Sequence, residues 1–592
     1  MYKRLWRKFI RVLFVGGVVA VLLGGRGSAR AEEPDTVPAL KAQFELQKQQ
    51  LEEQTKLLEE LKKRVDDLKE KSGAATAAEP APADLPPPPP PDKGTVEQIV
   101  GDYLHLRDAQ KKAAEEAKKA ADEHDGYKVG TNLGMSVHWN PLNGVTFETP
   151  NKDFTSHLGF WFQFDTVAFS QSGALKSPTQ IGDLQDGAFF RRIRPQWEGT
   201  AWEVVEWDII LQLEATANDV PQIDEAWVGL TKLPILGSVR VGKTRIPQGL
   251  EAGSYTGFKA GTFMEQSSFG SAFYEDLAPG IWTSNSVLHQ RMTWAAMFYR
   301  QDNVPGGSDS GQSGTSFADG KYAYAGRLTA LPVYENDGRC LLHLGASYGW
   351  RKAEDVPAPS GTQGGTVGPT FIDFRSRPLL RDAIGDYGGT NGNNATSLGL
   401  PGDSKQLIDT GLLTASSSTV IGTELLWIRG AFSLQAEYGW ASANDVYVPN
   451  PNPHGPKMLG LGDVWFRGYY VQLSYFLTGE NRRYDTRYGR LSRTTTAPYT
   501  PFWLTRGEDD RLLLGRGAWE LAARWNHLNL DNGLIQAGQT DAFEVGLNWY
   551  LSPTLRIQFE YLHQNRYDKS TGPNGTLPGD LDGLGLRTQW YF

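Results

Sequence analysis

Residues 584–592 read LGLRTQWYF and end the chain. A β-strand places successive side chains on opposite faces, so the alternation in this stretch predicts a strand with one apolar and one polar face. The first face would carry Leu584, Leu586, Thr588, Trp590 and Phe592, and the second Gly585, Arg587, Gln589 and Tyr591. A terminal aromatic residue after such a strand indicates the closing strand of a β-barrel whose apolar face meets lipid. We expect it to pair with the first strand after Tyr127.

Similar strands recur upstream from this terminal one. The same alternation is found at residues 342–351, 432–440, 519–526, 543–551 and 555–562. Runs of about nine or ten residues match the length of a tilted strand that crosses a membrane, and aromatic residues near their ends suit the two interfaces. A soluble β-sandwich is the alternative, but its strands average about five or six residues.

The connections between these strands alternate in length. Tight turns at Ser552-Pro553-Thr554 and Arg429-Gly430-Ala431 contrast with long polar stretches at 302–320, 355–402, 444–462 and 566–583. Short turns on one rim and long loops on the other are typical of outer-membrane barrels. At roughly 29 residues per strand with its connection, residues 127–592 predict an all-β, antiparallel transmembrane barrel of about 16 strands, with 18 as the alternative.

Composition agrees with a barrel and excludes several other classes. Mean hydropathy is −0.42 and no internal run of 18 apolar residues exists, which excludes a helical membrane protein. The 18 Trp, 23 Tyr, 26 Phe and 66 Gly suit strands of which only every second residue faces lipid. The single cysteine, Cys340, rules out an intrachain disulfide, and the net charge of −9 argues against nucleic acid as a partner.

The first residues have the pattern of an export signal. Basic residues between Lys3 and Arg11 precede an apolar stretch at 12–23, and Ala29-Arg30-Ala31 fits a cleavage site. We therefore predict that residues 1–31 are a signal peptide. A retained inner-membrane anchor is the alternative.

Helical patterns fill the chain between the signal peptide and the barrel. Residues 32–71 are predicted to form a periplasmic coiled coil, since apolar residues recur there at heptad spacing, interrupted by Gln47 and Gln54. Residues 72–94 are rich in Ala and Pro and predict a stiff linker that includes Pro86 to Pro91. Residues 95–125 predict a charged, Ala-rich helix.

Several barrel motifs resemble the phosphate-selective porin O and P family. They include FFRRIR at 189–194, DEAWVG at 224–229, VRVGK at 239–243, YFLTGE at 475–480 and GAWELAARW at 517–525. The resemblance extends over roughly 150–592 and implies a trimeric barrel of 16 strands. It also implies a constriction loop folded inward at about 248–280 and a pore that conducts anions past inward arginines and lysines.

The resemblance assigns candidate pore-lining and anion-binding residues. They are Arg191, Arg192, Arg194, Arg240, Lys243, Arg245 and Lys259. Alternation places Arg192 and Arg194 on one face and Arg191 on the other face or beyond the strand end. The alternative role for these arginines is to form salt bridges with carboxylates such as Glu198 and Glu214.

The expected constriction loop departs from the lysine-rich loop of phosphate-selective members. Lys259 is its only lysine, and it lies among the carboxylates Glu251, Glu265, Glu275 and Asp276. Because the charge of a lumen sets the sign of its selectivity, one cation among four carboxylates is not expected to build a phosphate site. The sequence therefore predicts a mild anion preference that depends on the arginines.

Five further arginines lie close together in the sequence. Arg482, Arg483, Arg487, Arg490 and Arg493 predict an ordinary solvated loop, with an external funnel for anions as the alternative. The nine His are scattered and no nucleophile or phosphate-loop motif occurs, so we expect no metal, no cofactor and no enzymatic activity.

These patterns together predict an outer-membrane porin, a homotrimer in lipid, that passes small anionic or polar solutes passively. Its N-terminal segment would lie in the periplasm, where the coiled coil could bind itself, the cell wall or a periplasmic protein. The alternative function is a barrel that anchors the coiled coil as an envelope tether. An active transporter is disfavoured, since residues 32–126 leave no room for a folded plug domain.

Overall fold

The structure is a computed structural model that describes part of the chain. It covers residues 135–140, 144–150, 152–177, 180–214, 222–252, 261–300, 322–355, 370–381, 406–449, 458–492, 496–502, 504–506, 512–567 and 577–592. The predicted signal peptide, coiled coil, linker and Ala-rich helix lie outside these residues, as do Lys259 and Arg493. A search of the described residues for a helix of the length and apolar character needed to cross a membrane finds none.

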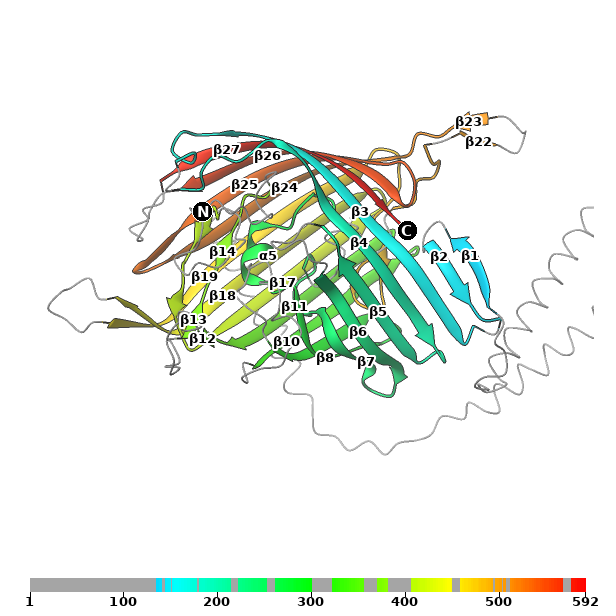
Figure 1. The fold of residues 1–592 in the computed structure, drawn as a ribbon, viewed down its shortest axis with the longest axis horizontal. Helices are drawn as coiled ribbons and strands as arrows, with labels where there is room; N and C mark the ends of the chain where they lie inside the picture. The colour runs from blue at the N-terminus through cyan, green and yellow to red at the C-terminus, as the bar shows by residue number, and fades with distance from the viewer. Residues whose placement is uncertain are drawn as a thin grey trace, which may run out of the picture. The chain divides into compact units, whose positions relative to one another are not determined.

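Sixteen antiparallel strands among the described residues close into a barrel (Figure 1). In chain order they are β3 (Phe154–Gln171), β4 (Gly187–Ala201), β5 (Val205–Gln212), β6 (Gln222–Leu233), β7 (Gly237–Arg245), β8 (Leu277–Val287), β9 (Met292–Arg300), β10 (Tyr322–Glu335), β11 (Cys340–Lys352), β17 (Ser417–Arg429), β18 (Phe432–Pro449), β19 (Met458–Phe476), β24 (Ala518–Asn532), β25 (Ile535–Tyr550), β26 (Leu555–Tyr567) and β27 (Gly579–Tyr591). Each pairs with the next, and β27 pairs with β3 from Leu581↔Gln171 to Tyr591↔Trp161. The prediction of 16 strands is confirmed.

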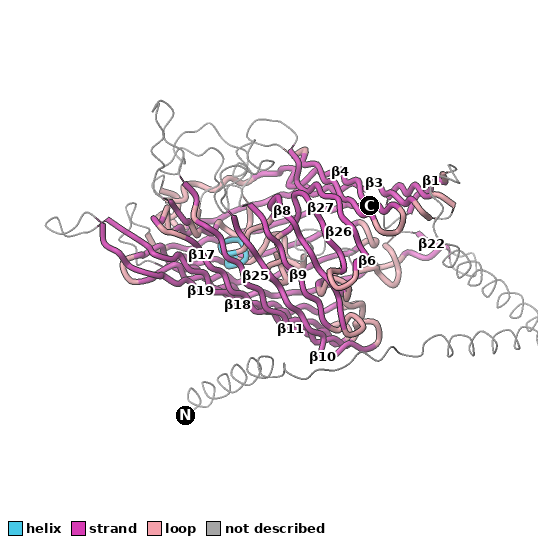
Figure 2. Tube along the Cα trace, turned by 90° about the horizontal axis from the view of Figure 1, so that it is seen from below, coloured by secondary structure: helices cyan, strands magenta, loops and turns pink. Residues whose placement is uncertain are grey.

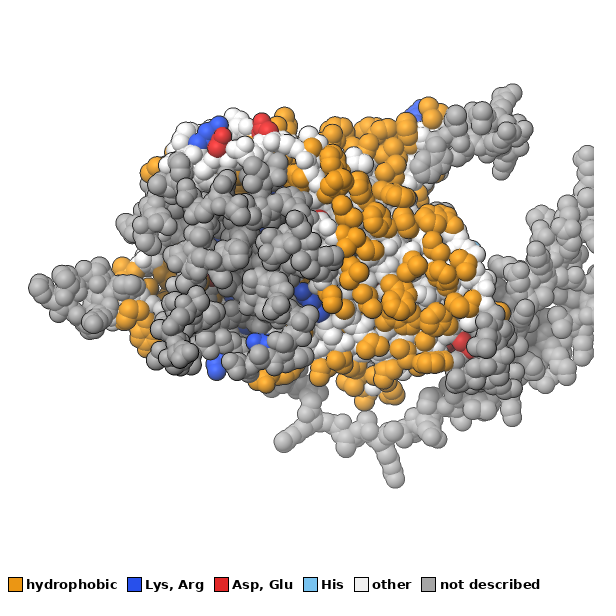
Figure 3. All heavy atoms as spheres, viewed as in Figure 1, with side chains coloured by type: hydrophobic (Ala, Val, Ile, Leu, Met, Phe, Trp, Pro, Cys, Tyr) orange, Lys and Arg blue, Asp and Glu red, His pale blue; other side chains and the backbone are white. Residues whose placement is uncertain are grey.

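The terminal strand has the two faces that its alternation predicted. Leu584 and Trp590 are 61% and 42% exposed on the outer face, whereas Arg587 and Gln589 are 1% and 0% exposed on the inner face. The same division holds around the barrel, and apolar side chains cover the outer surface over β4 to β7 (Figure 3). The polar residues of each strand therefore line the lumen.

The prediction that the terminal strand pairs with the first strand after Tyr127 is wrong, because its partner is β3. The first strands after Tyr127 are β1 (Ser136–Asn140) and β2 (Gly144–Glu148), and they form a hairpin that pairs with the start of β3. This hairpin occupies the edge of β3 just beyond the end of β27. The Phe592 ring lies there 4.8 Å from the Trp139 ring, and a Cβ at Gly144 would approach its Cδ2 to 2.6 Å.

Two long connections fold inward from the rim that carries the long loops. The first joins β7 to β8, and we call residues 246–252 and 261–276 the constriction segment; it contains the helix α5 (Ser268–Phe273). Both ribbon views place α5 among the strands, where Phe269 packs on Gly468, at which a Cβ would lie 2.5 Å away (Figures 1 and 2).

The second inward connection joins β11 to β17 and consists of short strands. They are β12 (Glu354–Asp355), β13 (Thr370–Ile372), β14 (Arg375–Ser376), β15 (Ile408–Asp409) and β16 (Leu413–Thr414). Phe374 in this connection packs with Phe273 of α5 and with Phe466 of the wall. The two inward connections therefore support each other inside the lumen.

A third inward segment enters from the opposite rim, where the turns are tight. The connection from β19 to β24 begins there, since the Phe476 amide donates to the carbonyl of Ala431 in a tight turn. It carries the short strands β20 (Tyr484–Asp485), β21 (Arg490–Leu491), β22 (Leu504–Arg506) and β23 (Leu512–Leu514). Residues 484–491 form a hairpin, here called the inner hairpin, whose Leu491 is 4% exposed and packs with Leu250.

The inner hairpin corrects the interpretation of the basic connection as an ordinary solvated loop or an external funnel. Arg482 and Arg490 are 7% and 8% exposed and Arg482 donates to Gln435 of the wall. The Leu491 side chain lies in an apolar cluster with residues of β10, β11 and β17, which holds the hairpin inside the barrel. The prediction failed because one tight-turn connection is unusually long, and only the closed barrel shows which rim it starts from.

Candidate functional site

Arginines dominate the inner wall and pair with carboxylates there. Buried guanidinium groups are costly unless they are paired and hydrogen-bonded, so their partners reveal what each one does. The arginines that are less than 10% exposed among the described residues are Arg192, Arg194, Arg240, Arg245, Arg327, Arg351, Arg375, Arg482, Arg490, Arg524, Arg556, Arg566 and Arg587. Two sets of lumen arginines are described below, one that anchors the constriction segment and one around a small cavity.

Glu265 of the constriction segment is the centre of the first group. It accepts from Arg191 Nε and Nη2 at 2.8 and 3.0 Å and from Arg587 Nη2 at 2.8 Å. Burial alone would raise the pKa of Glu265, but the charges of Arg191, Arg587 and Arg192 hold this pKa well below its usual range. Glu265 is therefore ionised and anchors the segment to β4 and β27.

Arg191 does not lie on the face that simple alternation predicted. The pairing of β3 with β4 shifts between Gln163↔Arg192 and Phe164↔Phe190, so that Arg191 is an extra residue in a β-bulge. The bulge turns Arg191 inward to Glu265, on the same side of the sheet as Arg192. The prediction that Arg191 lies on the opposite face from Arg192 or beyond the strand end is therefore wrong, since Arg191 is inside β4.

Arg192 and Arg194 do share the inner face, as predicted. Arg192 Nη1 donates to Gln163 at 2.7 Å, and its guanidinium lies 5.4 Å from the centroid of the Trp161 ring. Arg194 contacts Glu214 and Asp224, each at 2.7 Å. The alternative role as a salt-bridge partner of Glu214 is thus realised for Arg194.

The remaining carboxylates of the constriction segment also have arginine partners. Glu251 accepts from Arg524 at 2.9 Å, Glu275 accepts from Arg351 at 2.8 Å, and Asp276 contacts Arg245. Each carboxylate that the sequence counted against an anion site is therefore paired with a cation of the wall.

Lys243 lies apart from these arginines. Its ammonium donates to the carbonyl of Ile223 at 3.1 Å at an exposed position. Lys243 shares the outer face of β7 with Val241, which is 53% exposed. The prediction that Lys243 lines the lumen is wrong, since its neighbour Thr244 takes the inward position and donates to Glu225.

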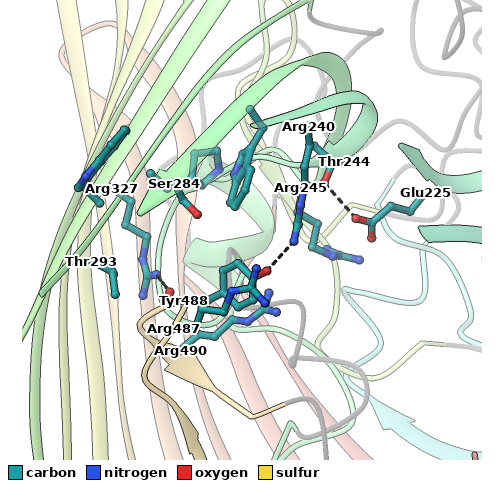
Figure 4. A pocket seen from close by; sticks show the side chains of 14 residues that line it. Glu225, Arg240, Thr244, Arg245, Ser284, Thr293, Arg327, Arg487, Tyr488 and Arg490 are labelled. Atoms are coloured by element: carbon teal, nitrogen blue, oxygen red, sulfur yellow. Dashed lines mark hydrogen bonds between the residues drawn. The ribbon is translucent and has the colours of Figure 1, made fainter. Parts of the chain in front are cut away.

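The second group surrounds a cavity of about 40 Å³ between the wall and the inner hairpin (Figure 4). Arg240 and Arg245 come from β7, Arg327 from β10, and Arg487 and Arg490 from the inner hairpin. The wall also contributes the carboxylate of Glu225 and the side chains of Thr244, Trp282, Ser284 and Thr293, and the hairpin adds Tyr488. We call these residues the arginine cavity.

Hydrogen bonds and ion pairs between the barrel wall and the inner hairpin hold the arginine cavity together. Arg240 Nη2 donates to the Tyr488 hydroxyl at 2.8 Å. Arg327 makes a fork to Glu424 at 2.8 and 2.6 Å and also donates to the Gly489 carbonyl at 2.9 Å. Arg487 donates to Glu206 at 2.9 Å.

The arginine cavity brings together predicted and unpredicted residues. Arg240 and Arg245 were candidates, whereas Arg327 was not singled out and Arg487 and Arg490 were assigned to a loop. One signal in the sequence could have indicated the inward position of Arg487 and Arg490. Their connection follows a strand that starts at a long loop, so it leaves the barrel at the rim with the tight turns, where a long arginine-rich connection is unexpected. A search of the described residues for groups of three or more potential metal ligands finds none.

Comparison with known proteins places the chain among porins. The family model for the phosphate-selective porin O and P matches residues 173–378 and 400–592. Porin O of Pseudomonas aeruginosa is 27% identical over 481 residues, which are 78% of this chain and 94% of that protein. An uncharacterized protein of Caulobacter vibrioides is 28% identical over 66% of this chain and 65% of its own length.

The chain also has a low similarity to solved structures. In vitro folded OmpT of Vibrio cholerae has a TM-score of 0.38 at 10% identity, covering 74% of this chain and 98% of its own. OprB of Pseudomonas putida has a TM-score of 0.37 at 9% identity, covering 73% and 94%.

Proposed function

The chain belongs to the phosphate-selective porin O and P family and is an outer-membrane porin, and we propose that its lumen passes small anionic, phosphate-like or polar solutes by passive diffusion. The observation that carries the anionic part is the arginine lining of the lumen. Fixed charges inside a pore set the sign of the ions that enter it. Five guanidinium groups and one carboxylate line the arginine cavity alone.

The pairing in the constriction segment supports anion preference rather than opposing it. The carboxylates of Glu251, Glu265, Glu275 and Asp276 would repel anions if they faced the solute path alone. Each instead contacts an arginine of the wall, which offsets its charge at close range. The proposed preference is mild, because the same pairs also offset the charge of those arginines.

The orientation follows from the unequal rims. In outer-membrane barrels the tight turns face the periplasm and the long loops face outward. The inner hairpin would then enter from the periplasmic side, and the constriction segment from outside. We also propose that the protein is a homotrimer. After removal of residues 1–31, the heptads at 32–71 would form a periplasmic coiled coil that holds the three protomers together.

Planar lipid bilayers test the proposal directly. The purified full chain is expected to insert with discrete conductance steps, and the reversal potential in a potassium chloride gradient is expected to have the sign of chloride selectivity. The absence of discrete conductance steps would contradict passive diffusion through the lumen. A cation-selective reversal potential would contradict anion preference and leave the pore itself standing.

A further inference from the structure

We propose that the β1–β2 hairpin is a membrane anchor that lays the side chains of Val137 and Trp139 against the phospholipids of the leaflet at the tight-turn rim. The hairpin lies beside the first part of β3, close to the C-terminus, and is not one of the sixteen strands of the ring (Figure 1). The inference therefore goes beyond the proposed function and does not depend on which solutes the lumen passes.

The strand pairing places the apolar side chains of the hairpin on one face. Residues that pair directly across antiparallel strands lie on the same face of a sheet. Trp139 pairs with Val145, Val145 pairs with Leu158 of β3, and Val137 pairs with Phe147. Leu158 is exposed on the outer face of the barrel. The apolar face of the hairpin therefore continues the lipid-facing surface of the barrel.

The opposite face of the hairpin is polar. It carries Ser136, His138, Thr146 and Glu148, which alternate with the apolar residues in the sequence. Thr146 Oγ1 lies 3.1 Å from Nδ1 of His157, which is on the inward face of β3. The hairpin thus has the two-faced pattern of a strand that meets lipid on one side and water on the other.

The apolar face is too exposed to suit contact with water alone. Val137 is 59% exposed and Trp139 is 55% exposed, and Met135 directly before the strand is also exposed. Contact of this surface with water is unfavourable in proportion to its apolar area. A continuous exposed apolar face marks a surface that another apolar body covers. Because this face continues the lipid-facing wall, we assign the cover to lipid.

Aromatic rings show the depth at which the hairpin lies. The Trp139 ring is 4.8 Å from the ring of Phe592 at the end of the terminal strand. On the other side of β3, Trp197 pairs with Leu158, and its ring lies 5.8 Å from that of Trp207. Tryptophan and other aromatic residues gather where the hydrocarbon core of a bilayer meets the headgroups. Trp139 therefore belongs to the aromatic belt at the tight-turn rim.

The backbone of the hairpin agrees with this depth. The edge of β3 passes from Phe592, which exchanges two hydrogen bonds of 3.1 Å with Phe160, to Val145 of β2, which pairs with Leu158. β2 is the only strand that pairs with β1 among the described residues. An unpaired strand edge is not tolerated in the hydrocarbon core, but water can bond to it among the headgroups. The hairpin is therefore an anchor at the membrane surface and not a further crossing strand.

Spin labels on neighbouring residues of β1 test the anchor. The full chain with its free cysteine replaced by Cys340→Ser carries a nitroxide at Val137→Cys or at His138→Cys in vesicles of phosphatidylethanolamine and phosphatidylglycerol. Oxygen concentrates in lipid, whereas a nickel chelate stays in water. The ratio of oxygen to chelate collisions should be several-fold higher at residue 137 than at residue 138. Leu586→Cys on the outer face of β27 gives the reference for a lipid-facing label.

Two results would overturn the anchor. Equal collision ratios at residues 137 and 138 would show that the two faces of the hairpin meet the same medium. Few collisions with either reagent at residue 137, together with magnetic coupling between the labels of one oligomer, would show that a second copy of the chain covers this face. Discrete conductance steps in the same preparation would keep either failure separate from a failure of the pore.

A charge placed on each face gives a second test. With the label at Val145→Cys, Trp139→Asp should lower the collision ratio several-fold, because a carboxylate withdraws the apolar face from lipid. His138→Asp is the matched control, since it places the same charge on the polar face of the same strand and should leave the ratio unchanged. Heat-modifiable migration in gels shows that the barrel has assembled in both variants. An unchanged ratio in Trp139→Asp would overturn the anchor.

Discussion

Glu265 shows how much of the lumen depends on one side chain. It joins the constriction segment to β4 through Arg191 and to β27 through Arg587. Removing one partner of a buried pair leaves the other charge uncompensated, at a cost of about 3–5 kcal/mol. Here Arg191 and Arg587 would both lose their contact with Glu265, although Arg587 would keep its pair with Asp165.

The first prediction is that Glu265→Gln releases the constriction segment. Open-channel current noise should increase, and the reversal potential should move toward stronger anion selectivity because one negative charge has left the lumen. Noise analysis and reversal potentials in bilayers measure both effects. Glu203→Gln is the matched control, since Glu203 loses the same charge in an exposed pair with Lys232. Equal noise in the two variants would contradict the anchoring role.

The second prediction concerns acid. Because the pKa of Glu265 is depressed in the folded protein, its contribution is present above the unfolded carboxyl value of about 4.3 and is lost as pH falls through the lower folded value. The difference in noise between the wild type and Glu265→Gln should therefore persist at pH 4.5 and vanish only in stronger acid. Disappearance of this difference between pH 6 and pH 5 would show that the carboxylate is not stabilised as described.

The third prediction is that Arg192→Gln weakens anion preference. A unit charge attracts an anion and repels a cation 4 Å away by about 1 kcal/mol each in water, so the anion-to-cation permeability ratio should fall by up to about thirtyfold. Lys243→Gln, which removes the same charge from the outer face, should leave the ratio unchanged. Reversal potentials in a salt gradient decide between the two outcomes, and an equal change in both variants would show that overall charge matters and position does not.

Among the structural elements, the inner hairpin is the one whose placement has the largest effect on the lumen. Its Leu491 lies in an apolar cluster with Leu250 of the constriction segment and with Leu331, Leu341 and Leu426 of the wall. The cluster joins segments that enter from opposite rims. Apolar contact between them therefore helps to define how far the lumen is filled.

The fourth prediction is that Leu491→Ser loosens the inner hairpin while the barrel still assembles. Truncating a buried leucine costs about 2–5 kcal/mol, and here the loss falls on the hairpin and not on the ladder of strands. Unitary conductance should increase, and heat-modifiable migration in gels should remain. Leu514→Ser, at a 65% exposed position of the same connection, is the control. Unchanged conductance in Leu491→Ser would mean that the hairpin does not obstruct the solute path.

The strands themselves were the most predictable elements. Alternation in 519–526, 543–551 and 555–562 placed the inner and outer faces correctly, because one face must be apolar and the other polar for a barrel in lipid. The bulge at Arg191 was not predictable in this way. A single extra residue leaves little trace in an alternating pattern, and it is recognised only from the pairing of β3 with β4.

For the whole molecule, the ring of strands is closed by the pairing of its first and last members. The strand β27 pairs with β3, and the β1–β2 hairpin then covers the edge of β3 beyond Phe592. We therefore expect the ring to close without the proposed coiled coil.

The fifth prediction is that deletion of residues 32–124 leaves unitary conductance and reversal potential unchanged. The experiment compares single channels of the full chain and the deletion variant, with the size of the assembled oligomer measured in parallel. A smaller oligomer with the same conductance would assign the coiled coil to assembly. Intact solute uptake together with a weakened cell envelope would favour the tether function, and loss of assembled barrels would contradict the independence of closure.

The sequence by itself determined the barrel and the faces of its terminal strand and narrowed the strand number to 16 or 18, because these follow from local alternation and from connection lengths. The tertiary structure decided which carboxylates meet which arginines and where the basic connection lies. Residues such as Arg240 and Tyr488 are 248 positions apart and share a hydrogen bond only because the ring closes and one hairpin folds into it. Pairing across a lumen depends on this closure, and no local pattern in residues 584–592 or elsewhere encodes it.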